Sequence, residues 1–198
     1  MKPEQRVVVG VTGASGSVYG RRLIQALLAL DPPLEVHAVA SEPGRVTWQY
    51  ELGGSFVPEQ IAGSAEAARR LVLHAADDLF SPLGSGSFRH RGMVIAPCSA
   101  RTLGAVAAGL ADGAVTRAAD VCLKERRPLV LMVRETPLSR IHIENMLRVT
   151  DAGAVVLPAS PGFYHRPTTI DELVDFVVAR ALDRLGLEHA VGTRWKDA

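Results

Sequence analysis

Two stretches far apart in the chain have residue types and spacing suited to binding phosphorylated molecules. The first, Val9-Gly-Val-Thr-Gly-Ala-Ser-Gly-Ser17, follows a short apolar run, and a glycine-rich turn in that position can point its backbone N–H groups at a phosphate. The second, residues 124–138, places Lys124 before another apolar run and Arg134 and Glu135 after it. Together they predict a site that handles two phosphorylated molecules.

The glycine loop favours a mononucleotide over a dinucleotide. Its glycines at positions 10, 13 and 16 depart from the G-x-G-x-x-G spacing of NAD-binding loops. The next strand ends at Ser41 and not at the carboxylate that would hold an NAD ribose, although Glu42 follows, and the chain has no Tyr-x-x-x-Lys pair of the short-chain reductases. A mononucleotide such as FMN fits better, and a tight turn that binds nothing is the alternative.

Arg134 and Glu135 are stronger ligand candidates than the arginines at positions 126 and 127. They directly follow an apolar run typical of a buried strand, where an arginine needs a partner and a phosphate is a natural one. Adjacent arginines at a helix end, such as Arg126 and Arg127, are usually solvated.

The elements that must position these residues alternate between strand and helix. Apolar runs predict strands, and apolar residues at helical spacing predict helices. A further helix is expected to open at residues 41–44, whereas residues 53–63 and 81–87 are typical of loops, with shorter elements between them. The expected strands are residues 6–11, 34–40, 93–96, 129–133 and 154–157, and the expected helices are residues 17–30, 102–108, 115–125, 139–152 and 170–185.

This alternation predicts an α/β fold, a Rossmann-like doubly wound, mostly parallel sheet with helices on both faces. We expect a single domain over residues 1–198, with a core at about 7–187 and a tail at 188–198. Ligands of such folds lie beyond the carboxyl ends of the strands, so the polar residues that follow each strand should line one crevice.

Composition narrows the functional classes. The 22 basic and 21 acidic residues nearly cancel, which argues against a nucleic-acid partner or an anionic membrane. The apolar runs are far shorter than the roughly 20 residues of a membrane span, and the first residues lack a signal-peptide pattern. Cys98 and Cys122 lie in apolar segments typical of buried thiols in a reducing compartment, and no zinc-ligand spacing occurs. We therefore expect a soluble cytoplasmic protein without a metal site.

Several stretches of the chain carry a family resemblance. They are Gly10-Val-Thr-Gly-Ala-Ser-Gly16, Ser85-Gly-Ser-Phe88, Ala96-Pro-Cys-Ser99 with Thr102-Leu103, Arg117-Ala-Ala-Asp-Val-Cys-Leu-Lys-Glu-Arg-Arg-Pro-Leu-Val-Leu131, Arg134-Glu-Thr-Pro-Leu138 and Pro161-Gly-Phe-Tyr-His-Arg-Pro167. The segments Lys-Glu-Arg-Arg-Pro and Arg-Glu-Thr-Pro-Leu are much more specific than a glycine loop. Together these stretches resemble the UbiX-type flavin prenyltransferases, from about residue 7 to residue 187.

The resemblance implies an activity and its partners. Members of this family bind FMN and dimethylallyl monophosphate, and they attach the prenyl group to N5 and C6 of reduced FMN without a metal ion. The product, prenylated FMN, is the cofactor of UbiD-type decarboxylases, and the family implies a homododecamer. Whether the donor here is the monophosphate or the diphosphate stays open.

The resemblance also implies roles for individual residues. Glu135, Ser15 and Lys124 are the expected catalytic residues, with Glu135 as acid or base unless the released phosphate takes the C6 proton. The expected FMN ligands are Gly13, Ala14, Ser15, Ser41, Ser99, Ala100, Arg101, Thr102 and Arg134, and the expected prenyl-phosphate ligands are Tyr164, Arg180, Lys124, Arg134 and Glu135.

The chemistry of these residue types agrees with a prenyl transfer. Breaking an allylic carbon–oxygen bond leaves a carbocation and a departing phosphate, whose negative charge must be stabilised. Asp77 and Asp78 lack the third aspartate of a magnesium-binding motif. Cationic side chains with the Tyr164 hydroxyl can form the phosphate clamp instead.

Other residues have more than one candidate role. Ser87 is a candidate for a loop that closes over the flavin, Arg117 for the phosphate network or a subunit contact, and Trp195 for a cover over the site or a plain anchor of the tail. A secondary role in the pocket is open for His165. His142 is expected to be packed or exposed, and His189 to lie at the surface. Arg101 and the Asp112-Gly113 pair depart from the usual lysine and Asp-Asn of the family.

Two rival functions remain open from the sequence. One is oxidative decarboxylation of a cysteinyl substrate on the same flavin-binding scaffold, against which the residues at 124, 134, 135 and 164 argue. The other is a flavin carrier without chemistry, which needs the FMN loops but not the phosphate clamp.

Overall fold

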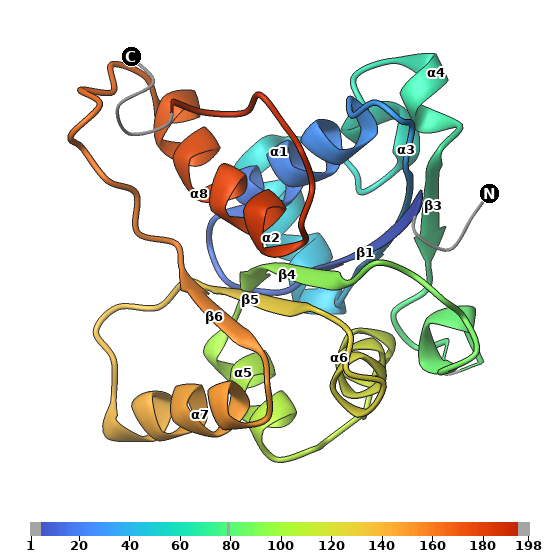
Figure 1. Cartoon of the computed structure of the whole chain (residues 1–198), viewed down its shortest axis with the longest axis vertical. Helices are drawn as coiled ribbons and strands as arrows, with labels where there is room; N and C mark the ends of the chain where they lie inside the picture. The colour runs from blue at the N-terminus through green and yellow to red at the C-terminus, as the bar shows by residue number, and fades with distance from the viewer. Residues whose placement is uncertain (1–4, 79, 194–198) are drawn as a thin grey trace.

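The computed structural model describes residues 5–78 and 80–193, and these form one parallel sheet of six strands in the order β3-β2-β1-β4-β5-β6 (Figure 1). The chain therefore builds one half of the sheet outward from β1 and then returns to build the other half outward from β4. The strands are β1 (Arg6–Val11), β2 (Glu35–Ala40), β3 (Leu71–His74), β4 (Met93–Cys98), β5 (Leu129–Val133) and β6 (Val155–Pro158).

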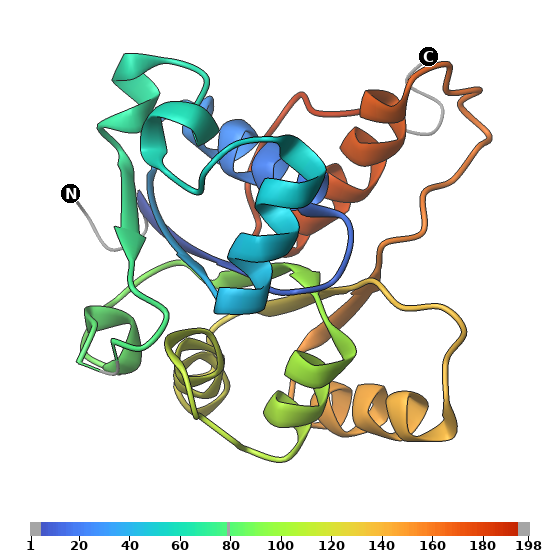
Figure 2. The ribbon, with the colours of Figure 1, turned by 180° about the vertical axis from the view of Figure 1, so that it is seen from behind.

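Helices cover both faces of the sheet, as Figures 1 and 2 show from opposite sides. One face carries α1 (Ser17–Leu28), α2 (Glu42–Leu52), α3 (Pro58–Ile61), α4 (Ala65–Ala68) and α8 (Ile170–Arg184). The other carries α5 (Ala100–Ala107), α6 (Ala114–Lys124) and α7 (Arg140–Asp151), with the short 3₁₀ turn η2 (Pro82–Gly84) beside α6. Among the described helices, none is long and apolar enough to cross a membrane.

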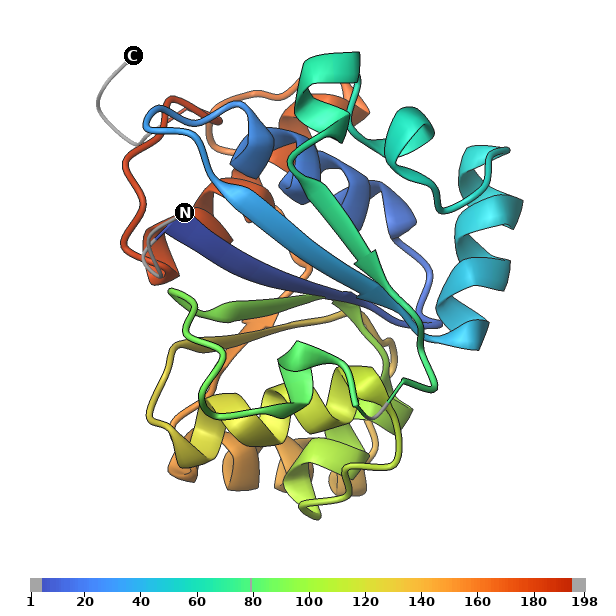
Figure 3. The same ribbon diagram turned by 90° about the vertical axis from the view of Figure 1, so that its right-hand side faces the viewer.

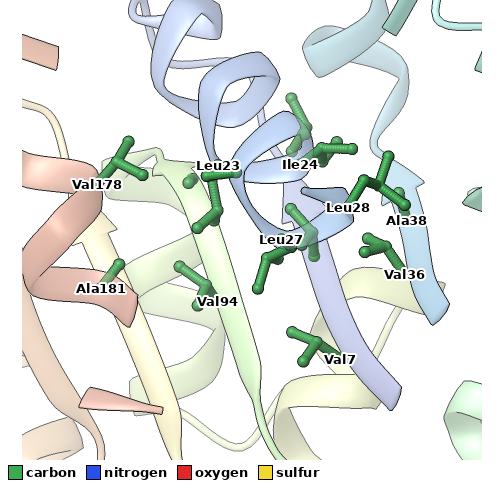
Figure 4. Packing of buried hydrophobic residues seen from close by; sticks show 14 of the residues in the cluster. Val7, Leu23, Ile24, Leu27, Leu28, Val36, Ala38, Val94, Val178 and Ala181 are labelled. Atoms are coloured by element: carbon green, nitrogen blue, oxygen red, sulfur yellow. The ribbon is translucent and has the colours of Figure 1, made fainter. Parts of the chain in front are cut away.

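The central strands are buried on both faces, which explains their continuous apolar runs. On one face, Leu23 and Leu27 of α1 pack with Val7, Val36 and Val94 of three neighbouring strands (Figure 4). On the other face, β4 and β5 pack against α5 and α6 in a second cluster. Both cores hold the strands rigidly, so the loops at the strand ends stand on a fixed base.

The predicted fold is confirmed, and the sheet proves to be entirely parallel. The strand β3 was not delimited by the sequence analysis, since its four residues, Leu-Val-Leu-His, are too few to show a period. It pairs with β2 at the edge of the sheet, and its carboxyl end lies at the same edge as those of β1 and β2 (Figure 3). The short helix α3 lies within residues 53–63, so the expectation of a loop there is wrong.

Candidate active site

Three helix N-termini meet at the carboxyl edge of the sheet. The adjacent strands β2, β1 and β4 run directly into α2, α1 and α5 there. The Ser41 N–H donates to the Val11 carbonyl at 2.9 Å, and Gly13 lies so close to Pro43 that an added Cβ would stand 2.6 Å from the Pro43 Cβ. A helix N-terminus carries a partial positive charge, so this edge of the sheet is suited to an anion.

Two of these helices are capped by serines that the sequence analysis assigned to FMN. The Ser41 hydroxyl accepts from the Gly44 N–H at 3.1 Å. The Ser99 hydroxyl accepts from the Thr102 N–H at 3.2 Å and donates to the Thr102 hydroxyl at 3.0 Å. The caps fix the first turns of α2 and α5, and the N–H groups of Ala100 and Arg101 have no acceptor within their own helix. These two N–H groups are therefore available to a ligand.

A carboxylate that the sequence analysis did not select lies at the third N-terminus. Glu51, from α2, accepts from the Ser17 N–H at 2.7 Å and from the Gly16 N–H at 3.0 Å. Burial raises the pKa of Glu51, but hydrogen bonds from the Ser15 hydroxyl and from these two N–H groups outweigh it and hold the pKa below its ordinary value. No spacing in the sequence indicates Glu51, because its partners are mostly backbone groups 34 and 35 residues away.

The donor set at this edge fits a phosphorylated mononucleotide. It combines backbone N–H groups, capping hydroxyls and a guanidinium, which are the usual partners of phosphate. Gly16 adopts a φ of 111°, which places the start of α1 in a conformation that residues with side chains rarely adopt. A side chain at Gly13 would collide with Pro43, so this loop is built close against the start of α2.

Arg134 and Glu135 leave β5 at the same edge, as predicted. The Arg134 Nε donates to the Ser15 carbonyl at 3.0 Å, which ties the end of β5 to the glycine loop. Glu135 is half-buried, and its Oε1 accepts from the Thr136 N–H at 3.0 Å. A guanidinium and a carboxylate therefore stand beside the loop expected to hold the flavin.

Tyr164 and Arg180 are brought together by Phe176 of α8, which the sequence analysis did not select. The Tyr164 ring meets the Phe176 ring edge-on at 5.7 Å, and the Arg180 guanidinium lies 5.5 Å from the centre of the same ring. Arg180 also pairs with Asp183 at 3.4 Å. His165 stacks on Phe176 at 5.6 Å, so its ring packs beside Tyr164.

Lys124 and Ser87 lie at the opposite edge of the sheet. The helix α6 leads into the start of β5, so Lys124, its last residue, precedes that strand while Arg134 follows it. Ser87 lies beside the same turn, because Arg127 donates to the Gly86 carbonyl at 2.5 Å and to the Phe88 carbonyl at 2.7 Å. Within one subunit, Lys124 therefore does not share a pocket with Glu135, and Ser87 does not lie beside the glycine loop.

The remaining candidates occupy ordinary structural positions. Arg101 is largely exposed and lies 3.5 Å from Asp112, and Arg117 pairs with Asp120 at 2.9 Å. His142 hydrogen-bonds at the start of α7. The His189 side chain is buried and lies 3.2 Å from Asp183, so the expectation that it lies at the surface is wrong. Arg127 is engaged with the backbone carbonyls, contrary to the expectation of a solvated arginine. Trp195 lies outside the described residues.

Both cysteines are structural. Cys98 and Cys122 are free and fully buried, and burial raises the pKa of each thiol to about 12. A protonated, inaccessible thiol is a poor nucleophile. Within the described part of the chain, no group of three His, Cys, Asp or Glu side chains is placed to hold a metal ion.

The flavoprotein family model matches residues 1–182. A Halalkalibacterium halodurans protein named flavin prenyltransferase UbiX is 45% identical over 194 residues, which cover 94% of this chain and 91% of that protein. The crystal structure of AnUbiX in complex with FMN and dimethylallyl pyrophosphate has a TM-score of 0.88 and 40% identity, and it covers 98% of this chain and 99% of that one. A dodecameric FMN-dependent UbiX-like decarboxylase from Escherichia coli O157:H7 has a TM-score of 0.86 and 44% identity, with 96% and 99% covered. The chain therefore belongs to the flavoprotein family, and within it to the UbiX-type flavin prenyltransferases.

Proposed function

We propose that this chain transfers a dimethylallyl group from dimethylallyl monophosphate to N5 and C6 of reduced FMN. The observation that carries this proposal is the convergence of three helix N-termini with Arg134 and Glu135 at one edge of the sheet. Relatives that are 43 and 45% identical over nearly the whole chain are named flavin prenyltransferases, which supports the same reaction here.

FMN would lie along the glycine loop and the starts of α2 and α5. When bound and reduced, the flavin supplies the nucleophilic N5 and C6 atoms. The chain contributes N–H donors and hydroxyls that hold the cofactor, and Glu51 fixes the Gly16 and Ser17 N–H groups at the start of α1. The residues that we propose to hold FMN are Gly13, Ala14, Ser15, Ser41, Ser99, Ala100, Arg101, Thr102 and Arg134.

The prenyl phosphate would be held by Arg134, Arg180 and the Tyr164 hydroxyl. Arginine offers a planar pair of donors that matches phosphate, so Arg180 can exchange the Asp183 carboxylate for the phosphate of the substrate. These groups stabilise the charge that develops on the phosphate as the carbon–oxygen bond stretches, and we propose that they do so without a metal ion.

Glu135 is the proposed acid or base at the flavin. We propose that its carboxylate accepts the proton that leaves C6. The released phosphate is the alternative acceptor of that proton. We propose that Ser15, on the loop that Arg134 contacts, orients the flavin near N5.

We infer that the complete site needs a second copy of the chain. Lys124 and Ser87 cannot reach the Arg134 edge of their own subunit, but a neighbouring subunit in a homo-oligomer can present them there. The dodecamer described for the Escherichia coli relative is an assembly in which such contacts are possible. We propose a homododecamer here as well.

The wider setting is also a proposal. We propose that the chain acts as one domain in the cytoplasm and that its product, prenylated FMN, serves a UbiD-type decarboxylase. The nearly balanced charge of the chain supports the absence of a nucleic-acid or anionic-membrane partner.

Phosphate release tests the proposed reaction. Under anaerobic conditions, the protein should release phosphate from dimethylallyl monophosphate only when reduced FMN is present. A flavin carrier would bind FMN and release no phosphate. An oxidative decarboxylase would instead release carbon dioxide from a cysteinyl peptide with oxidised FMN, and either of these results would count against the transferase.

A further inference from the structure

The side chain of Thr12 joins two of the loops that line the proposed flavin crevice. Thr12 follows β1 directly and is 1% exposed. Its hydroxyl donates to the Pro97 carbonyl at 2.7 Å and accepts from the Ser99 N–H at 2.8 Å. A single hydroxyl therefore binds both a carbonyl and an N–H of the β4–α5 loop.

This contact stands where the two halves of the sheet diverge. Pairing between β1 and β4 runs from Val8 opposite Met93 to Gly10 opposite Ile95. Beyond it, α1 continues over one face of the sheet and α5 over the other (Figure 1). Strand order reverses between β1 and β4, and such a switch point is where open α/β sheets form a ligand crevice.

The Thr12 hydroxyl is the side-chain link across the base of that crevice. The Thr12 N–H also donates to Pro97, at 3.2 Å, but the start of α5 is held through the hydroxyl, which accepts from Ser99. Ser99 in turn caps α5 through Thr102. The glycine loop on one side and the N-terminus of α5 on the other therefore keep a separation that depends on this hydroxyl.

We propose that Thr12 is a positioning residue that sets the separation of the two flavin-binding loops and thereby determines the affinity for FMN. The inference rests on the proposed flavin site. Thr12 itself lies beneath the crevice, so it acts through Gly13 and Ser99 and not by touching the flavin.

Thr12→Val tests this because valine keeps the shape and removes the hydroxyl. Leaving one buried hydrogen-bonding group without a partner should raise the Kd for FMN at least about tenfold. Thr12→Ser, which keeps the hydroxyl, should restore the affinity to within about threefold of the wild type. If Thr12→Val does not fold, Thr12→Cys is the substitute, because its thiol is a weaker donor than a hydroxyl. Its Kd for FMN should lie above that of Thr12→Ser and below the tenfold increase expected for Thr12→Val.

A kinetic measurement separates positioning from a general loss of stability. Partial unfolding lowers the apparent kcat and leaves KM unchanged, whereas a misplaced loop should raise KM for FMN and leave KM for dimethylallyl monophosphate unchanged. Ser81→Ala is the matched control, since Ser81 is also buried and its hydroxyl hydrogen-bonds to His74, the last residue of the edge strand β3. It should lower the melting temperature without changing the Kd for FMN.

Two results would overturn the inference. One is a folded Thr12→Val protein that binds FMN as tightly as the wild type, and the other is a Thr12→Ser variant that loses as much affinity as Thr12→Val. Wild-type protein that binds no FMN would refute the proposed function together with this inference, so the two failures are distinguishable.

Discussion

The position of Lys124 gives a quantitative prediction about shared sites. The strand β5 separates Lys124 from Arg134 and spans five residues, which is about 16 Å of extended chain. A lysine side chain reaches only about 6 Å beyond its Cα. If Lys124 acts on the prenyl phosphate, it must therefore do so in the site of a neighbouring subunit.

Mixed assemblies of two inactive variants reveal this arrangement. Lys124→Ala removes one cation from the departing phosphate, and Glu135→Gln removes the proposed base, so each should lower the rate on the order of 100-fold. When equal amounts of the two variants co-assemble at random, about one quarter of the sites combine a wild-type Lys124 with a wild-type Glu135 from its neighbour. The mixture should recover about one quarter of the wild-type rate, well above either variant alone.

The matched control is the wild type co-assembled with the Lys124→Ala/Glu135→Gln double variant. Shared sites predict about one quarter of the wild-type rate for this mixture as well. If both residues served the same subunit, the mixture of single variants would stay inactive and the control would keep about one half of the rate. Those two rates, measured on tagged and separated mixed oligomers, would refute the conclusion that Lys124 acts in the site of a neighbouring subunit.

The other predictions concern single groups. Glu135→Gln should slow formation of the flavin adduct while the Kd for FMN stays unchanged, and loss of FMN binding would assign Glu135 to the cofactor instead. A chelator should leave the rate of prenyl transfer unchanged, because arginine and lysine side chains neutralise the phosphate; a rate restored only by added magnesium would contradict this. Burial raises the pKa of Cys98 and Cys122 to about 12, so both thiols should stay protonated at pH 8 and react with a disulfide reagent only as fast as the protein unfolds. Fast labelling of the folded protein would show that they are accessible.

The loops at the carboxyl edge could be predicted because chain order alone places them. Strand and helix alternate at regular spacing, and the strands of a parallel sheet all end at one edge. A parallel sheet therefore places Ser41, Ser99 and Arg134, which follow three of its strands, at that edge. The position of Lys124 at the opposite edge has the same origin. A helix that precedes a strand ends at the amino edge of the sheet, and a motif that spans β5 is therefore divided between both edges.

Neither Glu51 nor Phe176 could be predicted from the sequence, and the reason differs between them. Glu51 binds mainly backbone N–H groups, which have no residue identity in a sequence. Phe176 has the position of an ordinary core aromatic on α8, and only the structure shows Tyr164 and Arg180 against its ring. The side-chain link through Thr12 is hidden in the same way, since its partners are the backbone groups of a loop 85 and 87 residues away.

The most direct test of the account is the mass of the flavin after one turnover. The protein is incubated anaerobically with reduced FMN and dimethylallyl monophosphate, with the diphosphate in a parallel sample, and the flavin is released and analysed by mass spectrometry. The account predicts a flavin heavier by one five-carbon prenyl unit with the monophosphate. An unchanged flavin in both samples, with reduction of FMN verified by its spectrum, would contradict it.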